Sequence, residues 1–297
     1  MARDTLTQLK GHTWIIPGPT NIGVVEENGE VYLIDSGNDK DTGRRIRKAL
    51  DETGWKLKGI VNTHSNADHI GGNDYLQRQT GCEIWATPLE RSFIEHPKFE
   101  SAFLWGGFPV KELSSKFFEA KPSKITQPIE PDTETINGVL EVVPLPGHFF
   151  GMVGLLTRDG VLFLGDAMFG QKVLEKYKLP FIYDVKSYRE TIERVSAIDA
   201  DFYVVSHGEV QTEIGELAET NLALVHDVEE RLLGILERSM GFDEILKKVC
   251  DHYGIVLDHG QYALVGSTLR SFLSYLYNEG KLRYEFRENR LYWERMR

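Results

Sequence analysis

The chain has 297 residues, with 34 lysine and arginine residues against 45 aspartate and glutamate residues, which gives a formal net charge of −11. A content of 41% hydrophobic and 27% charged residues is typical of a soluble globular protein and excludes a disordered or fibrous chain. The negative charge argues against a surface built for nucleic acid or an anionic membrane. The two cysteines, Cys82 and Cys250, lie far apart and do not indicate a disulfide framework.

The length predicts either one large domain or a medium domain with a small appendage. The amino-terminal segment lacks the apolar core of a signal peptide, and no apolar run is long enough to span a bilayer. We therefore expect a cytoplasmic protein without membrane contact.

The first 240 residues alternate between short apolar runs and helical patterns. Asn28-Gly29 predicts a hairpin turn, and Ser187 is the expected N-cap of a helix. Strands and helices in this order predict an α/β protein with two sheets and helices outside them. The predicted strands cover 12–18, 22–35, 57–63, 82–88, 139–147, 152–166 and 201–208, and the predicted helices cover 41–53, 73–79 and 187–198.

The segment 89–137 is less regular and rich in aromatic residues. These rings, with Phe149 and Phe150, either form a lid and an apolar wall beside the site described below, or pack a core or a homodimer contact. Both interpretations stay open from the sequence. The residues concerned are Phe93, Phe99, Phe103, Trp105, Phe108, Phe117 and Phe118.

The last third predicts helices over 216–239, 242–253 and 264–280, followed by a hairpin over 282–296. Helix, turn, helix and a two-stranded wing form a winged-helix pattern, so we place a boundary near Met240-Gly241 and expect domains 1–240 and 241–297. The second part has nine basic and eight acidic residues, a charge of +1, which leaves −12 for the first. A nucleic-acid-reading wing has a clear basic excess. For the role of residues 241–297 we therefore rank packing or dimerisation first, a lid over the site second and nucleic-acid binding last.

Polar residues with metal-binding chemistry follow several of the predicted strands. The segment 62–72 contains His64, Asn66, Asp68 and His69 directly after the strand over 57–63. A lone histidine is more often structural, and a lone aspartate often caps a turn. Because several such residues each follow a strand, and strands of one sandwich end at a common rim, we expect a metal site there. The residues at the other strand ends are Asp35, His148, Asp166 and His207.

These motifs, in this order over about residues 12–240, resemble the metallo-β-lactamase superfamily of metallohydrolases. The resemblance implies an αββα sandwich with two metals at one rim. It implies a first metal held by His64, the residue at position 66 and His148, and a second held by Asp68, His69 and His207, with Asp166 bridging both. Asp35 and Thr63 are expected to orient the ligands from behind. No organic cofactor is implied.

Position 66 departs from the family pattern, because Asn66 stands where the family usually has histidine. An amide oxygen is a weaker ligand for zinc than an imidazole nitrogen. We therefore expect a divalent metal, zinc before iron or manganese, to fill the second site preferentially, with one or two ions bound in all.

A divalent metal lowers the pKa of bound water and supplies hydroxide near neutral pH. Asp68 is the expected catalytic residue, since a carboxylate between the ligand sets can orient that water and accept its proton. We predict hydrolysis of an ester, thioester, lactone or amide of a small molecule. The alternatives are a ribonuclease or phosphodiesterase that uses the winged helix, and a catalytically impaired metal-binding protein.

Overall fold

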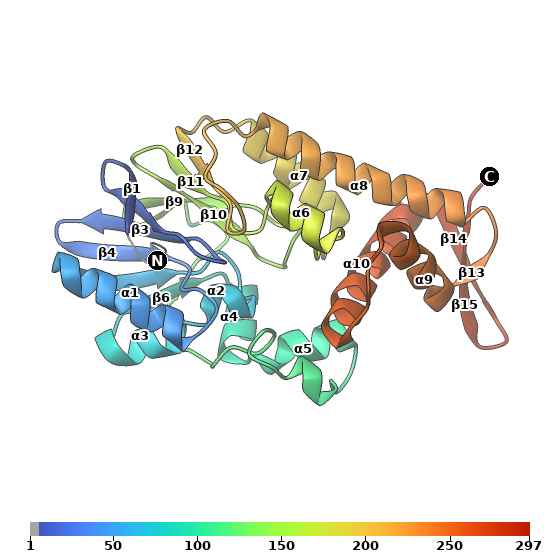
Figure 1. Ribbon diagram of the computed structural model, residues 1–297, viewed down its shortest axis with the longest axis horizontal. Helices are drawn as coiled ribbons and strands as arrows, with labels where there is room; N and C mark the ends of the chain where they lie inside the picture. The colour runs from blue at the N-terminus through green and yellow to red at the C-terminus, as the bar shows by residue number, and fades with distance from the viewer. Residues whose placement is uncertain (1–5) are drawn as a thin grey trace.

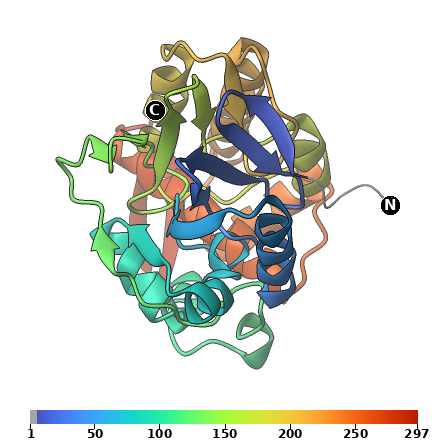
Figure 2. The same cartoon turned by 90° about the vertical axis from the view of Figure 1, so that its left-hand side faces the viewer.

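A computed structural model, which describes residues 6–297, places two β-sheets face to face with helices on both outer sides (Figure 1). This arrangement confirms the predicted αββα layers. Figure 2 shows the same layers from one end of the molecule, with α1 and α3 against one sheet and α7 and α8 against the other. Within residues 6–297, no helix is both long and apolar enough to cross a membrane.

The first sheet has seven strands, antiparallel from β1 to β4 and parallel from β4 to β7. The predicted hairpin between β3 and β4 is confirmed, because Asn28 and Gly29 both adopt positive φ, 54° and 83°. The strands, in sheet order, are β1 (Thr7–Lys10), β2 (Thr13–Ile16), β3 (Ile22–Glu27), β4 (Glu30–Ile34), β5 (Lys56–Val61), β6 (Glu83–Ala86) and β7 (Gln127–Pro128).

Strand β4 is apolar on both faces, which is what a strand in the middle of a layered sandwich requires. Tyr32 and Ile34 point into the core between the sheets, and Val31 and Leu33 point toward the outer helices. Successive side chains alternate between faces, so a single run of apolar residues supplies two cores.

The second sheet has five strands, and only β11 and β12 run parallel. Strand β12 is shorter than predicted, since residues 205–208 leave the sheet and turn onto the rim. In sheet order the strands are β12 (Phe202–Val204), β11 (Val161–Phe163), β10 (Val153–Thr157), β9 (Leu140–Pro144) and β8 (Thr135–Ile136).

Helices α1 (Lys40–Thr53) and α3 (Asn73–Thr80) cover the outer face of the first sheet. Asp39 caps α1 by accepting from the Thr42 amide, and the helix stops at Gly54, which adopts φ 77°. Helices α7 (Val185–Ser196) and α8 (Gly215–Ile235) cover the second sheet.

The predicted N-cap of α7 was wrong. Asp184 is the cap, and its carboxylate accepts from both the amide and the hydroxyl of Ser187. Ser187 therefore lies in the first turn of the helix as the donor to the cap, because an extended residue three positions earlier already offers a stronger acceptor. The expected buried face of Tyr188, Ile192 and Val195 is confirmed.

The C-terminal part contains β13 (Met240–Gly241), α9 (Phe242–Tyr253), α10 (His259–Asn278) and a hairpin of β14 (Leu282–Arg287) and β15 (Arg290–Arg295). Helix α10 begins five residues before the predicted start, because Asp258 caps it by accepting from the Gln261 amide. One apolar cluster runs from the second sheet through α8 into α9 and α10. The winged-helix assignment and the boundary near Met240-Gly241 stay predictions.

The segment between β6 and β7 is folded into α4 (Pro88–Glu95), α5 (Lys98–Trp105) and a single 3₁₀ turn, η1 (Lys111–Leu113). Phe93 and Phe103 pack with Phe149 and Phe150 in an aromatic cluster, so these rings form a core. Phe108 is 97% exposed. Helices α5 and α10 lie side by side at the end of the sandwich (Figure 1).

Candidate metal centre

The predicted site residues converge at one rim because each follows the carboxyl end of a strand. Asp35 follows β4, the segment from Thr63 to His69 follows β5, and His148, Asp166 and His207 come after β9, β11 and β12. The short helix α2 (Ala67–Ile70) begins inside the motif and carries Asp68 and His69. A hydrogen bond from the Ser36 amide to the His69 oxygen, 2.7 Å long, ties the β4 and β5 loops together.

Each of the four histidines of the site, His64, His69, His148 and His207, forms a hydrogen bond through Nδ1 to a group outside the site. The Nε2 atom of each ring therefore faces the centre of the site. A backbone carbonyl can only accept, so His148 and His207 donate from Nδ1 and carry the lone pair on Nε2 when they are neutral. The partners of Nδ1 are Thr63 Oγ1 for His64 (3.0 Å), Asp35 Oδ2 for His69 (2.8 Å), the Phe181 oxygen for His148 (2.9 Å) and the Pro19 oxygen for His207 (2.7 Å).

Asp35 and Thr63 stand behind two of these histidines, as expected for orienting groups. Asp35 accepts from the amide and the hydroxyl of Thr63, both at 2.8 Å, and from His69. Because the Thr63 hydroxyl donates to Asp35, it accepts from His64 Nδ1. Asp35 adopts φ 62°, a backbone conformation uncommon for residues other than glycine, which aims its carboxylate at the motif loop.

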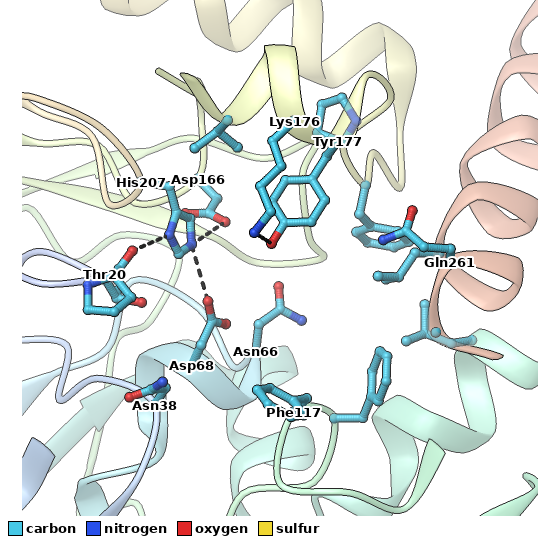
Figure 3. Close-up of a pocket in the computed structure, with 18 of the residues that line it drawn as sticks. Thr20, Asn38, Asn66, Asp68, Phe117, Asp166, Lys176, Tyr177, His207 and Gln261 are labelled. Carbon is cyan, nitrogen blue, oxygen red and sulfur yellow. Dashed lines mark hydrogen bonds and ion pairs between the residues drawn. The ribbon is translucent and has the colours of Figure 1, made fainter. Parts of the chain in front are cut away.

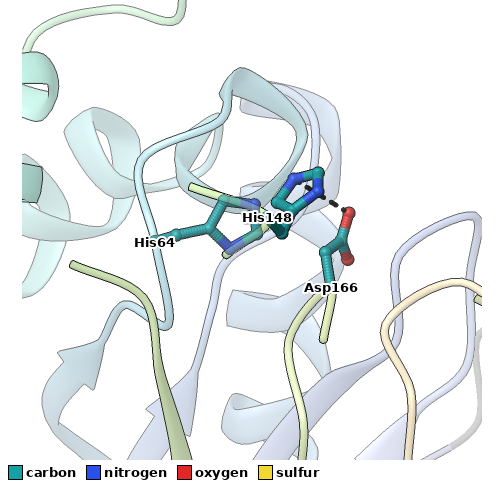
Figure 4. Close-up of side chains that lie close together, drawn as sticks. All are labelled: His64, His148 and Asp166. Atoms are coloured by element: carbon teal, nitrogen blue, oxygen red, sulfur yellow. Dashed lines mark ion pairs between the residues drawn. The ribbon is translucent and has the colours of Figure 1, made fainter. Parts of the chain in front are cut away.

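Two groups of side chains have the spacing of metal ligands. His64, His148 and Asp166 form the first group, and Asp68, His69 and His207 form the second; within each group the ligand atoms lie within 4.8 Å of one another (Figure 4 shows the first). Asp166 lies between the groups. Its Oδ2 is 3.6 Å from His148 Nε2 and 3.4 Å from His207 Nε2, and its Oδ1 is 3.4 Å from His69 Nε2.

The chemistry of this donor set fits a divalent cation. Three buried atoms at its centre have no hydrogen-bond partner within residues 6–297: His64 Nε2, His69 Nε2 and Asp166 Oδ1. Buried polar atoms are almost always paired, and an orphaned set of imidazole nitrogens and a carboxylate oxygen is the set that zinc binds.

The charges of the two groups differ. Burial lowers the pKa of His64 well below its usual range and lowers that of His148. Burial acts in the same direction on His69, but the carboxylates of Asp166, Asp68 and Asp35 raise its pKa to about 10. The second group therefore lies in the stronger negative potential, which favours a cation there.

Asn66 also reaches the first group. Its Oδ1 atom lies 2.9 Å from His148 Nε2, and its Nδ2 atom donates to Glu100 Oε1 at 2.8 Å. All seven side chains predicted as ligands are thus brought to one place, and their role as ligands stays a prediction.

A cavity of about 880 Å³ opens over this rim (Figure 3). Asn66, Asp68, Asp166 and His207 form part of its floor, and the start of α10 lines its far side. Of the two interpretations left open for Phe149 and Phe150, packing in a core is the one observed, because Phe149 is fully buried in the aromatic cluster and neither ring lines the cavity. The rings of Phe117, Phe118, Phe169, Tyr177 and Phe181 line it instead.

Two buried glutamates beside the motif had not been predicted. Glu90, on α4, accepts from the amide and hydroxyl of Ser65 and from the Gly151 amide, so it ties the loop of His64 to the loop of His148. Glu100, on α5, contacts Asn66. Each lies four residues before a buried apolar residue of its own helix, Ile94 or Leu104. This four-residue spacing puts each glutamate on the buried side of its helix.

Glu90 makes the stability of the protein pH-dependent. Burial raises its pKa to about 7 from a usual 4.5, against the hydrogen bonds from Ser65 and Gly151. Below pH 4.5 both states hold the proton and there is no penalty. As the pH rises from 4.5 to 7, the unfolded state releases the Glu90 proton while the folded state keeps it. The free energy of unfolding therefore falls by about 3 kcal/mol, and the fall is complete above pH 7.

We expect Glu90→Gln, which mimics the protonated acid, to gain about 3 kcal/mol of unfolding free energy relative to the unmodified protein between pH 4.5 and pH 8. Urea unfolding at both pH values gives the unfolding free energy of the variant and of the unmodified protein. The contributions of the other titrating groups are the same in both proteins and cancel in the difference. A stability difference that does not change with pH would contradict this assignment.

The family model of the metallo-beta-lactamase superfamily matches residues 15–207. YobT, an uncharacterised protein of Bacillus subtilis (strain 168), is 33% identical over 151 residues, 50% of this chain and 62% of YobT. A hydroxyacylglutathione hydrolase of Methylobacillus flagellatus is 27% identical over 150 residues, 50% of this chain and 47% of that protein. The chain thus spans about half the length of the curated relatives that it matches.

Solved structures share the fold over nearly the whole chain. A metallo-beta-lactamase family protein from Thermus thermophilus superposes with a TM-score of 0.76 at 21% identity, covering 96% of this chain and 99% of that one. A beta-lactamase domain protein from Burkholderia ambifaria gives 0.74 at 18% identity, covering 99% and 95%. With the histidine and aspartate groups at the sandwich rim and a family match over most of the two sheets, this chain belongs to the metallo-beta-lactamase superfamily.

Proposed function

We propose that the protein is a metal-dependent hydrolase that cleaves acyl thioesters of small molecules. The observation that carries the proposal is the orphaned set of imidazole and carboxylate atoms at the floor of a largely apolar cavity. Zinc, before iron or manganese, suits these ligands. A divalent cation bound there lowers the pKa of water and polarises a substrate carbonyl.

We expect the second ligand group to bind a cation before the first group does. Asp68, His69 and His207, with the shared Asp166, offer two imidazoles and two carboxylates. The first group offers His64 and His148 with the weaker Asn66 amide and the same Asp166. Charge and ligand type therefore favour the second site for a single cation.

The position of Asp68 supports a role in proton transfer. Its side chain is 39% exposed and lines the cavity, with Oδ2 at 3.2 Å from His207 Nε2. It can accept a proton from a water on the floor of the cavity and release it to the departing thiolate, which leaves as the thiol. Asp166 also borders the cavity floor, but its side chain is only 7% exposed and lies between the imidazoles of His148 and His207.

The choice of thioesters rests on the cavity and on the relatives. Several curated relatives are named hydroxyacylglutathione hydrolases, and hydroxyacylglutathione is a thioester. Rings and aliphatic side chains line the walls, which suits an acyl chain. Of the three lysines that line the cavity, Lys116 and Lys172 are paired with Asp39 and Glu209. A cavity with apolar walls and two lysines already paired with carboxylates does not favour a polyanionic substrate.

Lys176 has no carboxylate partner within residues 6–297; its Nζ atom lies 2.9 Å from the Tyr177 hydroxyl, and both side chains point into the cavity toward Asn66 and Asp68 (Figure 3). For thioesters that carry a carboxylate, we expect Lys176→Met to raise KM about fivefold to tenfold with kcat nearly unchanged, because one charge-assisted contact is lost. Lys172→Met, whose lysine is already paired, is the matched control. An equal change for uncharged thioesters would contradict a charge contact.

A hydrolysis panel tests the proposed function. Zinc-loaded protein should release thiol from acyl thioesters, hydroxyacylglutathione among them, faster than it cleaves simple esters, lactones, amides or phosphodiesters. Turnover of a phosphodiester or short RNA above that of every thioester would favour the nuclease alternative. No turnover of any substrate by zinc-loaded protein would favour the catalytically impaired alternative.

A further inference from the structure

Asn66 does not make the contact that an asparagine at its position usually makes. It directly precedes α2, where asparagine side chains commonly cap the helix, yet it forms no cap hydrogen bond. Its amide instead spans two buried groups, with Nδ2 on Glu100 Oε1 at 2.8 Å and Oδ1 at 2.9 Å from His148 Nε2. The side chain is thus held away from the backbone and toward the first ligand group.

Glu100 is a buried carboxylate without a compensating cation. The residue is 5% exposed, and no lysine or arginine forms an ion pair with it in the described part of the chain. The Asn66 amide is the one side-chain donor that it has among residues 6–297. A buried unpaired carboxylate costs folding free energy, so its place beside the motif calls for a role other than packing.

The contacts of Glu100 and His148 together fix how the amide points. Asn66 Nδ2 donates to Glu100 Oε1, so the amide turns its NH₂ group to Glu100 and its carbonyl oxygen the other way. His148 donates from Nδ1 to the Phe181 oxygen, so its Nε2 lone pair also faces that oxygen. Two lone pairs 2.9 Å apart repel each other unless a cation lies against both.

We propose that Glu100 is a positioning residue that holds the Asn66 carbonyl oxygen toward the first metal site. The Glu100–Asn66 pair would then take the place of the histidine at this position, with an amide oxygen as ligand and a carboxylate orienting it from behind. Carboxylates that orient histidine ligands work in the same way. The inference rests on the proposed metal centre and assigns Glu100 no contact with substrate.

Glu100→Leu, which removes the acceptor, and Glu100→Asp test the role on the whole chain. Zinc binding to metal-stripped protein, measured by competition with a chromophoric chelator, should show first-site affinity reduced about tenfold or more in both variants, with the second site unchanged. The aspartate variant keeps the carboxyl group but is one methylene shorter, so it separates loss of the hydrogen bond from loss of the acid. Glu112→Gln, which removes a charge from the same cavity without touching Asn66, should leave both affinities unchanged.

A double-mutant cycle with Asn66→Ala completes the test. Once the Asn66 amide has been removed, Glu100→Leu should not weaken the first site further. The inference is overturned if the folded Glu100 variants bind zinc like the unmodified protein, if Glu112→Gln has the same effect, or if the loss persists in full in the Asn66→Ala background. Melting temperatures establish that each variant is folded. If the unmodified protein binds no zinc at all, it is the proposed function that fails.

Discussion

Asp68→Asn should lower kcat for thioester hydrolysis by about a thousandfold while the fold and the zinc at the remaining ligands are retained. The isosteric amide keeps an oxygen near His207 but cannot accept the proton that Asp68 takes from water, and general acid–base groups contribute about 10²–10⁴ in rate. The measurement is kcat at saturating zinc, with metal content determined on the same sample.

Asp68 is proposed both as a metal ligand and as a proton acceptor, and kcat measured across pH and at excess zinc separates the two roles. If the variant has lost a proton acceptor, its turnover stays slow at every pH even with zinc bound. Loss of a ligand alone would be rescued by excess zinc. Asp132→Asn changes an exposed aspartate in the turn between β7 and β8; it is the control and should retain full activity. Unchanged turnover by zinc-loaded Asp68→Asn would refute the assignment of Asp68 as the catalytic residue.

Asn66→His should strengthen the first metal site by at least about tenfold, because an imidazole nitrogen replaces an amide oxygen beside His148. The unmodified protein should bind one zinc tightly and a second weakly, whereas the variant should bind two with similar affinity. Calorimetric titration of metal-stripped protein gives both stoichiometry and affinity. Two equally tight equivalents on the unmodified protein would contradict the expected order of filling.

The site could be predicted from the sequence because its residues stand directly after strands. Strand ends of a sandwich share a rim, so His64, His148, Asp166 and His207 needed only the strand pattern to be brought together. The αββα layers were predictable for the same reason, since apolar runs such as β4 and amphipathic helices such as α1 carry strong periodic signals.

Glu90 and Glu100 could not be predicted in this way. They lie on the eight-residue helices α4 and α5, in a segment whose aromatic residues hide the helical period. A glutamate on such a helix is normally solvated, and only the tertiary contact with Ser65 or Asn66 explains its burial. The start of α10 was missed because its cap, Asp258, stands outside the apolar stripe from which the helix was recognised.

Zinc add-back tests the central claim that this rim is a hydrolytic metal centre. Chelator-stripped protein is supplied with increasing equivalents of zinc, and thiol release from an acyl thioester is followed at each step. We expect no turnover without metal, turnover that rises with zinc bound at the second site, and only the residual rate of Asp68→Asn at any zinc level. Equal turnover by stripped and zinc-loaded protein, or by the Asp68 variant and the unmodified protein, would contradict it.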